Sequence, residues 1–216
     1  MPRPPAGRAV TAIAPAPLVP PDVVVLDTSA AIEALLDDQP RHDEYAAFLA
    51  ACAAGGTAIA YCEILELELA EACVGIALAR IHGRDWRRKR NDGRALRPAR
   101  KLIEETAAKW QAFLDSVEQT LRVPLDWGTL HDDAEHVETF GAAVLDRAIG
   151  LMQRYPIASY DAAHAATALL LEAPIVTGDR GFARVSGLEI LTDSASVPIC
   201  RRVRGGRQSG TSSGGH

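Results

Sequence analysis

The chain has 216 residues, a formal net charge of −5 at neutral pH and a composition that is 48% hydrophobic with few aromatic residues. This length holds one ordinary domain with a substantial core, and no apolar run reaches the roughly 20 residues that cross a bilayer, so we expect a globular protein without a membrane anchor. The Pro-broken opening lacks the apolar segment of a signal peptide, and the four cysteines lack zinc-site or disulfide-framework spacing, which together favour a cytoplasmic protein.

Strands and helices alternate along the predicted secondary structure. Residues 1–20 are rich in Pro and Ala and residues 204–216 in Gly and Ser, so we expect neither end to fold. Hydrophobic patterns between them predict, in chain order, a strand near 22–27, helices near 29–37 and 42–54, a strand near 57–62, helices near 64–82, 100–121, 129–154 and 161–172, and strands near 174–178 and 188–191. This alternation predicts one α/β domain over 22–203, with a parallel sheet flanked by helices and a basic helical insertion around 83–128.

Two of the predicted strands end at an aspartate. The segment VVVLDTS reaches Asp27 after an apolar run, and the segment IVTGD reaches Asp179 in the same way. Short runs rich in Val and Ile are typical of buried parallel strands, and functional groups of open α/β sheets gather at the carboxyl ends of such strands. We therefore expect Asp27 and Asp179 to lie close together.

Further acids adjoin the neighbouring predicted elements. Glu66 and Glu68 follow the second strand in the segment ELELAE, and Asp161 opens a later helix. Carboxylates that gather at one site repel one another unless a cation neutralises them, and oxygen ligands suit Mg²⁺ or Mn²⁺. Such an ion activates water and stabilises phosphate charge, which is the chemistry of phosphodiester hydrolysis. Helix capping is the alternative explanation for Asp27 and Asp161 when each is taken singly.

Positive charge is concentrated in one segment. Residues 84–101 contain nine Lys or Arg and two Asp, a local charge of +7. Such a segment could hold a polyanion near an acidic pocket, through side chains such as Arg87, Arg88, Lys89 and Arg90. A solvated face of a helix or loop explains the same charges equally well.

Several of these segments carry a family resemblance. They are VVVLDTSAAI, CEILELELAEA, SYDAAHAATAL, and IVTGDRGF followed by GLEIL. In their order and spacing, over roughly Val23 to Asp193, the chain resembles a PIN domain and specifically the VapC-like ribonuclease toxins of bacterial toxin–antitoxin systems.

The resemblance implies a fold, an activity and partners. The fold is a three-layer sandwich with a mainly five-stranded parallel sheet, and the activity is Mg²⁺- or Mn²⁺-dependent cleavage of RNA. The family acids fall on Asp27, Glu68, Asp161 and Asp179, and the small hydroxyl positions beside them fall on Thr28, Ser29 and Thr177. As partners we expect RNA, a cognate antitoxin and a second copy of the chain, and no membrane.

Three alternatives remain open. The second family acid could be Glu66, although Glu68 leaves a preceding strand of usual length. A non-catalytic PIN-like module that binds RNA or protein would keep the fold, but all four acid positions are occupied here. A haloacid-dehalogenase-type phosphatase also begins with a strand ending in Asp, but it should have a second Asp two positions on, where this chain has Ser29.

Overall fold

The computed structural model describes residues 10–12, 21–125 and 140–192. Its strands are β1 (Val10–Ala12), β2 (Val23–Leu26), β3 (Ala58–Cys62), β4 (Thr120–Val123), β5 (Ile175–Val176) and β6 (Ile190–Thr192). Its α-helices are α1 (Thr28–Leu35), α2 (His42–Ala54), α3 (Ile64–His82), α4 (Leu96–Ser116), α5 (Phe140–Arg154) and α6 (Ser159–Leu170). Its 3₁₀ helices are η1 (Gly83–Lys89), η2 (Gly93–Ala95) and η4 (Arg180–Arg184).

The sheet has the strand order β1-β6-β5-β2-β3-β4, and every pair of neighbours is parallel. Strand β2 lies between β3 and β5, where Val25 pairs with both Ala60 and Ile175. The predicted α/β class with a parallel sheet is confirmed. Because all strands run the same way, the residues that follow β2, β3 and β5 emerge at one edge of the sheet.

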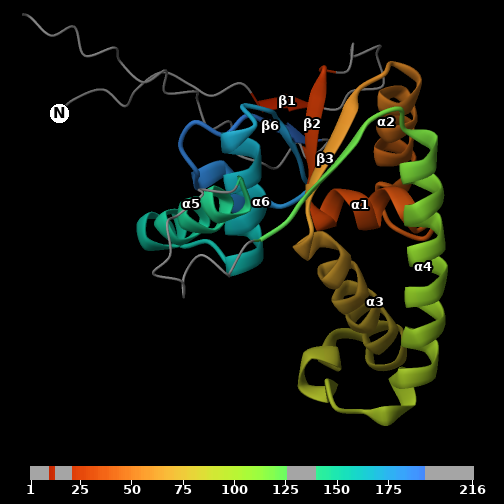
Figure 1. The fold of residues 1–216 in the computed structure, drawn as a ribbon. Helices are drawn as coiled ribbons and strands as arrows, with labels where there is room; N and C mark the ends of the chain where they lie inside the picture. The colour runs from red at the N-terminus through yellow and green to blue at the C-terminus, as the bar shows by residue number, and fades with distance from the viewer. Residues whose placement is uncertain (1–9, 13–20, 126–139, 193–216) are drawn as a thin grey trace, which may run out of the picture.

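Helices cover both faces of this sheet, as Figure 1 shows. Side chains of β2 alternate between the faces, so Val24 and Leu26 pack with α1, α2 and α4, whereas Val25 packs with α5 and α6. Both faces are apolar because a parallel sheet is buried on both sides. The result is the three-layer sandwich expected from the resemblance.

Two strands differ from the sequence-based expectation. Strand β1 adds a sixth, edge strand within residues 1–20, where no folded element was expected, and it pairs with β6. Strand β4 lies where the sequence predicted the end of a helix over 100–121, because α4 already ends at Ser116. Three of the four β4 residues are exposed, so this edge strand lacks the apolar run that identifies a buried one.

Part of the prediction falls outside the described residues. The helix expected near 129–154 is described only as α5 from Phe140 onward, and both residues 126–139 and the expected Gly/Ser tail at 204–216 lie outside. Within the described ranges, no helix has the length and hydrophobicity to span a membrane.

Helices α3 and α4, with η1 and η2 between them, form an arm. Helix α3 packs against α4, and the 3₁₀ helices η1 and η2 connect their far ends. Figure 1 shows this arm extending below the sheet. The basic residues of η1 are therefore at the opposite end of α3 from the edge of the sheet.

Candidate metal and catalytic centre

Asp27 follows β2 and is the N-cap of α1. Its Oδ2 atom accepts hydrogen bonds from the Ser29 backbone N–H at 3.2 Å, from the Ser29 hydroxyl and from the Thr177 hydroxyl at 2.7 Å. Its side chain is buried, with the residue only 3% exposed. The capping explanation is thus correct for Asp27 as far as it goes, but a cap alone does not require a buried carboxylate with donors from a second strand.

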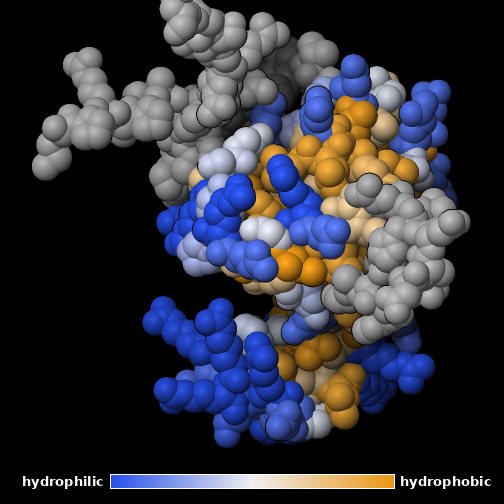
Figure 2. Space-filling view, turned by 60° about the vertical axis from the view of Figure 1, so that its left-hand side comes forward, coloured by the Kyte–Doolittle hydropathy of each residue, from blue (hydrophilic) through white to orange (hydrophobic). Residues whose placement is uncertain are grey.

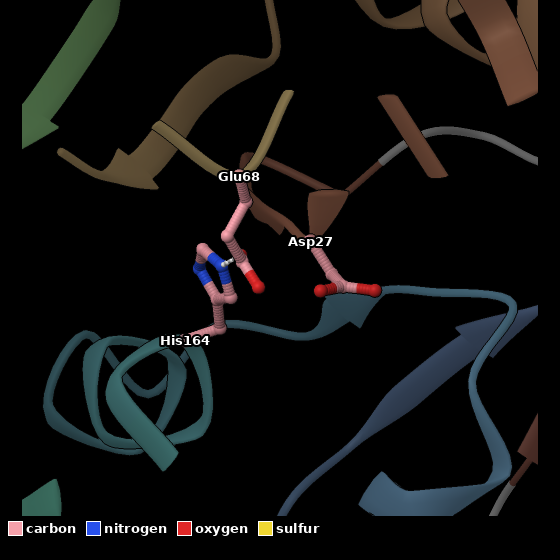
Figure 3. Close-up of side chains that lie close together, drawn as sticks. All are labelled: Asp27, Glu68 and His164. Atoms are coloured by element: carbon pink, nitrogen blue, oxygen red, sulfur yellow. Dashed lines mark hydrogen bonds and ion pairs between the residues drawn. The ribbon is translucent and has the colours of Figure 1, made fainter. Parts of the chain in front are cut away.

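Glu68 reaches the same place from the second turn of α3. Its Oε2 atom accepts a hydrogen bond from the Thr28 hydroxyl at 2.6 Å and lies 2.7 Å from Nε2 of His164 on α6. One ligand atom each from Asp27, Glu68 and His164 lie within 4.8 Å of one another. Figure 3 shows the three side chains converging from three different elements.

Asp161 stands beside this group on the first turn of α6. Burial raises the pKa of its carboxyl to about 6, and the charges of Asp27, Asp179 and Glu68 act in the same direction. The four predicted acids therefore form one electrostatic group.

Asp179 follows β5 and is exposed. Its Oδ1 atom accepts a hydrogen bond from the Gly181 N–H at 2.6 Å, so it caps the 3₁₀ helix η4. Its own N–H donates to the Thr177 hydroxyl at 2.9 Å, which ties it to the group around Asp27. Of the four acids it has the side chain with most access to solvent.

His164 is a site residue that the sequence analysis did not select. It is fully buried, three positions after Asp161 on the same helix. Burial lowers the pKa of its imidazole, but the hydrogen bond to Glu68 and the charges of Asp27, Glu68 and Asp161 outweigh burial and raise it. The signal that could have identified it is the i, i+3 spacing, which puts both side chains on one helix face.

The negative charge of the carboxylates in this site still exceeds the positive charge of the single His164 imidazolium. Burial raises the pKa of Asp27, and the Glu68 charge adds to the effect, while His164, Ser29 and Thr177 oppose it. Crowded, partly buried carboxylates whose pKa values rise are in a setting that a cation stabilises. Carboxylate oxygens dominate the donor set, which fits Mg²⁺ or Mn²⁺, and the His164 nitrogen is engaged by Glu68. The residues present therefore fit a hard divalent ion.

Glu66 has different partners from Glu68. Its Oε2 atom accepts a hydrogen bond from the Arg122 guanidinium at 3.0 Å, and Oε1 accepts one from the Tyr61 hydroxyl at 3.2 Å. Residues two apart on a helix are about 200° apart around its axis, so the two glutamates face opposite ways. The structure brings Glu68, and not Glu66, to Asp27.

The basic side chains expected to bind a polyanion lie away from this group. They are on and just after η1, at the far end of α3: Arg87, Arg88, Lys89 and Arg90.

Residues 122–188 match the family model of the PIN domain. Over this segment the chain is similar to PIN domains. The matched segment includes Asp161, His164, Thr177 and Asp179, whereas Asp27 and Glu68 precede it. This match confirms the predicted resemblance and favours it over the haloacid-dehalogenase-type phosphatase.

Two solved structures are similar to this chain. A chain in the crystal structure of VapBC2 from Rickettsia felis bound to a DNA fragment from their promoter has 17% sequence identity and a TM-score of 0.45, with 78% of this chain and 96% of that chain covered. A chain in the crystal structure of FitAcB from Neisseria gonorrhoeae has 17% identity and a TM-score of 0.47, with 79% and 97% covered. No curated protein sequence matches this chain.

Proposed function

We propose that this protein is a metal-dependent endoribonuclease. The observation that carries the proposal is the meeting of Asp27, Glu68 and His164, whose ligand atoms lie within 4.8 Å of one another at the carboxyl edge of a parallel sheet. Asp161 lies close enough to interact electrostatically with Asp27 and Glu68, and it adds a further carboxylate to the site. A PIN domain match for the segment that carries Asp161 and Asp179 supports a nuclease.

In this proposal Asp27, Glu68, Asp161 and Asp179 hold Mg²⁺ or Mn²⁺. The bound ion would supply an activated water and would stabilise negative charge on the phosphate. The overall reaction is hydrolysis, in which the water oxygen bonds to phosphorus, the bond from phosphorus to the leaving oxygen breaks, and the leaving oxygen takes up a proton.

Neighbouring side chains keep the carboxylates in position. Ser29 and Thr177 donate to Asp27, and Thr28 and His164 engage Glu68. Each of these hydrogen bonds limits rotation of a carboxylate, which lowers the cost of organising the site for the transition state. Their part is positioning, because none of them needs to touch the reacting phosphate.

The basic residues of the arm supply affinity for the polyanion. Lys and Arg side chains that neutralise phosphates release counterions, so they bind nucleic acid without regard to sequence. Arg87, Arg88, Lys89 and Arg90 have this role in the proposal. RNA is the proposed substrate because the motifs resemble those of the VapC-like ribonucleases.

The same resemblance supports a biological setting. We propose that the protein is the toxin of a toxin–antitoxin pair, that it acts on RNA in the cytoplasm as a homodimer, and that a cognate antitoxin protein holds it inactive. Co-expression of the protein with the product of an adjacent open reading frame, followed by size-exclusion chromatography with light scattering, tests the last two points.

The enzymatic proposal is tested by incubating purified full-length protein with labelled single-stranded RNA and, in parallel, with DNA of the same sequence. Cleavage of RNA within the strand, dependent on Mg²⁺ or Mn²⁺ and abolished by Asp27→Asn, is the expected result. RNA that remains intact with either metal over a range of sequences would instead support a non-catalytic PIN-like module.

A further inference from the structure

A groove leads from the acidic centre to the basic arm along one side of α3. Thr28 and Glu68 line one end and Trp86 and Arg90 line the other, and the cavity has a volume of about 670 Å³. Between the ends its wall is mainly apolar, formed by residues of α3 such as Ala72, Ile76 and Ala79. Eleven residues of helix separate Glu68 from Ala79, which corresponds to roughly 16 Å along the axis.

At the far end of the groove, the indole ring of Trp86 packs against Gly75 of α3. A Cβ atom on Gly75 would lie 3.4 Å from Cη2 of the indole, so the absence of a side chain at this position gives the ring room to approach α3. The ring is only partly buried. The guanidinium carbons of Arg87 and Arg90 lie 5.5 and 6.0 Å from its centroid. Both cations are thus close enough for a cation–π contact with this ring.

Contacts of Asp92 tie the loop after η1 to the end of α3. Asp92 accepts hydrogen bonds from the backbone N–H and the guanidinium of Arg94 and lies 2.9 Å from Nε2 of His82 at the end of α3. In contrast, within the part of the chain that the structure describes, none of the four basic side chains from residue 87 to 90 forms an ion pair. Figure 2 shows the strongly hydrophilic surface of the arm, separated from the body of the molecule by a hollow. The positive charge is therefore available to a ligand.

We infer that this groove is a subsite for single-stranded nucleic acid, in which a base stacks on Trp86 while Arg87 and Arg90 contact the adjacent phosphates. Aromatic stacking combined with basic side chains is the usual way in which proteins hold unpaired strands. A polyanion fits the charges better than an apolar peptide does, because the two cations next to the ring form no ion pair within the described residues. The inference rests on the proposed nuclease function, and it assigns to the groove the task of fixing the distance between the stacked nucleotide and the cleaved bond.

The subsite can be tested by binding without cleavage. Full-length Asp27→Asn protein in EDTA is titrated into a fluorescently labelled single-stranded RNA, and Trp86→Ala, Trp86→Phe and Arg90→Ala are then compared in that background. We expect Trp86→Ala to weaken binding about tenfold and Trp86→Phe less than about threefold, because Phe still stacks. Arg90→Ala should make the slope of log K for RNA binding against log salt concentration shallower, by the amount expected for the loss of about one phosphate contact. Arg147→Ala, an exposed charge removal on α5 and outside the groove, is the matched control and should change neither quantity.

A second measurement covers the case in which Trp86→Ala disturbs folding. Addition of RNA should quench tryptophan emission of the parent protein, and this change should shrink in Trp86→Phe. Equal RNA affinity of folded Trp86→Ala and parent, or equal quenching in parent and Trp86→Phe, would overturn the inference. Retained RNA binding combined with loss of a protein partner from Trp86→Ala would do the same, since the groove would then be a protein-binding site.

The outcomes separate the subsite from the nuclease proposal. Cleavage is measured independently with Asp27 intact. If no condition gives cleavage but Trp86→Ala still loses RNA affinity, the nuclease proposal fails and the subsite stands. If Trp86→Ala binds and cuts RNA at the same positions as wild type, the subsite fails and the nuclease proposal stands.

Discussion

The Thr177 hydroxyl donates a hydrogen bond of 2.7 Å to Oδ2 of Asp27, although 150 residues separate the two in sequence. The bond joins the carboxyl ends of β5 and β2, which are neighbours in the sheet. Ser29 strengthens the connection, because its hydroxyl contacts Asp27 and also accepts a hydrogen bond from the Gly178 N–H at 2.9 Å. The carboxylate of Asp27 is thus fixed by both strands.

The donor set predicts which metal supports activity. Because carboxylate oxygens dominate it, RNA cleavage should require Mg²⁺ or Mn²⁺ and should not require Zn²⁺. The measurement is RNA cleavage by protein first stripped with EDTA and dialysed, then supplied with each metal in turn. Undiminished cleavage in excess EDTA would contradict a metal mechanism.

The two glutamates of α3 give a matched pair of variants. Glu68→Gln should lower metal-dependent cleavage by about a hundredfold or more, because it removes a charge that faces Asp27. Glu66→Gln should leave cleavage near wild type, because it only weakens a half-exposed ion pair to Arg122, which is worth at most about 1 kcal/mol. The reverse order of the two effects would mean that Glu66 is the ligand.

Asp27→Asn and Asp161→Asn should separate catalysis from folding. Each variant removes one negative charge at nearly constant shape, so cleavage should fall by about a hundredfold or more while the metal-free protein melts at the same temperature or higher. Asn caps a helix about as well as Asp, so a purely capping role predicts unchanged activity. Cleavage assays beside thermal melts in EDTA measure both, and full activity in both variants would end the nuclease assignment.

The pKa of Asp161 predicts a dependence of stability on pH. Its carboxyl titrates near pH 6 in the folded protein, above its usual value of 3.8, so the folded state binds more protons than the unfolded state between these values. The free energy of unfolding contributed by this group therefore falls as pH rises through that window. The raised pKa values of Asp27 and His164 act in the same direction.

Metal-free protein should accordingly melt at a higher temperature at pH 5.5 than at pH 7.5. Asp161→Asn should reduce this difference, since it no longer titrates, and saturating Mg²⁺ should reduce it as well by stabilising the ionised carboxylates. Calorimetry at the two pH values, with EDTA or Mg²⁺, measures the effect. An identical pH dependence in wild type and Asp161→Asn would show that Asp161 does not titrate as described.

The sequence was most informative where strands are buried. The runs that precede Asp27 and Asp179 are apolar on both faces of the sheet, so both strands and the acids at their ends could be predicted. Strand β4 could not, because its exposed residues, including Leu121, carry no alternating or continuous apolar signal. Its place in the sheet depends on pairing with β3.

Contacts between residues that are far apart in the chain could not be predicted from the sequence either. The sequence analysis did not select His164, because its place in the site depends on meeting Glu68, which is 96 residues away. The choice between Glu66 and Glu68 rested on an assumed strand length, whereas in the structure the two side chains face opposite ways on α3, and it is Glu68 that meets His164. Local patterns identify candidate acids, but only the fold determines which of them converge.

The position of β2 between β3 and β5 has a consequence for synthesis of the chain. Asp27 and Glu68 are translated early, but the Thr177 hydroxyl that holds Asp27 belongs to a strand made about 150 residues later. A ribosome-bound chain that stops before β5 therefore lacks one of the two strands that pair with β2, together with the Thr177 side of the centre. For an enzyme proposed to cut RNA, this order postpones a complete active site until the ribosome has translated β5.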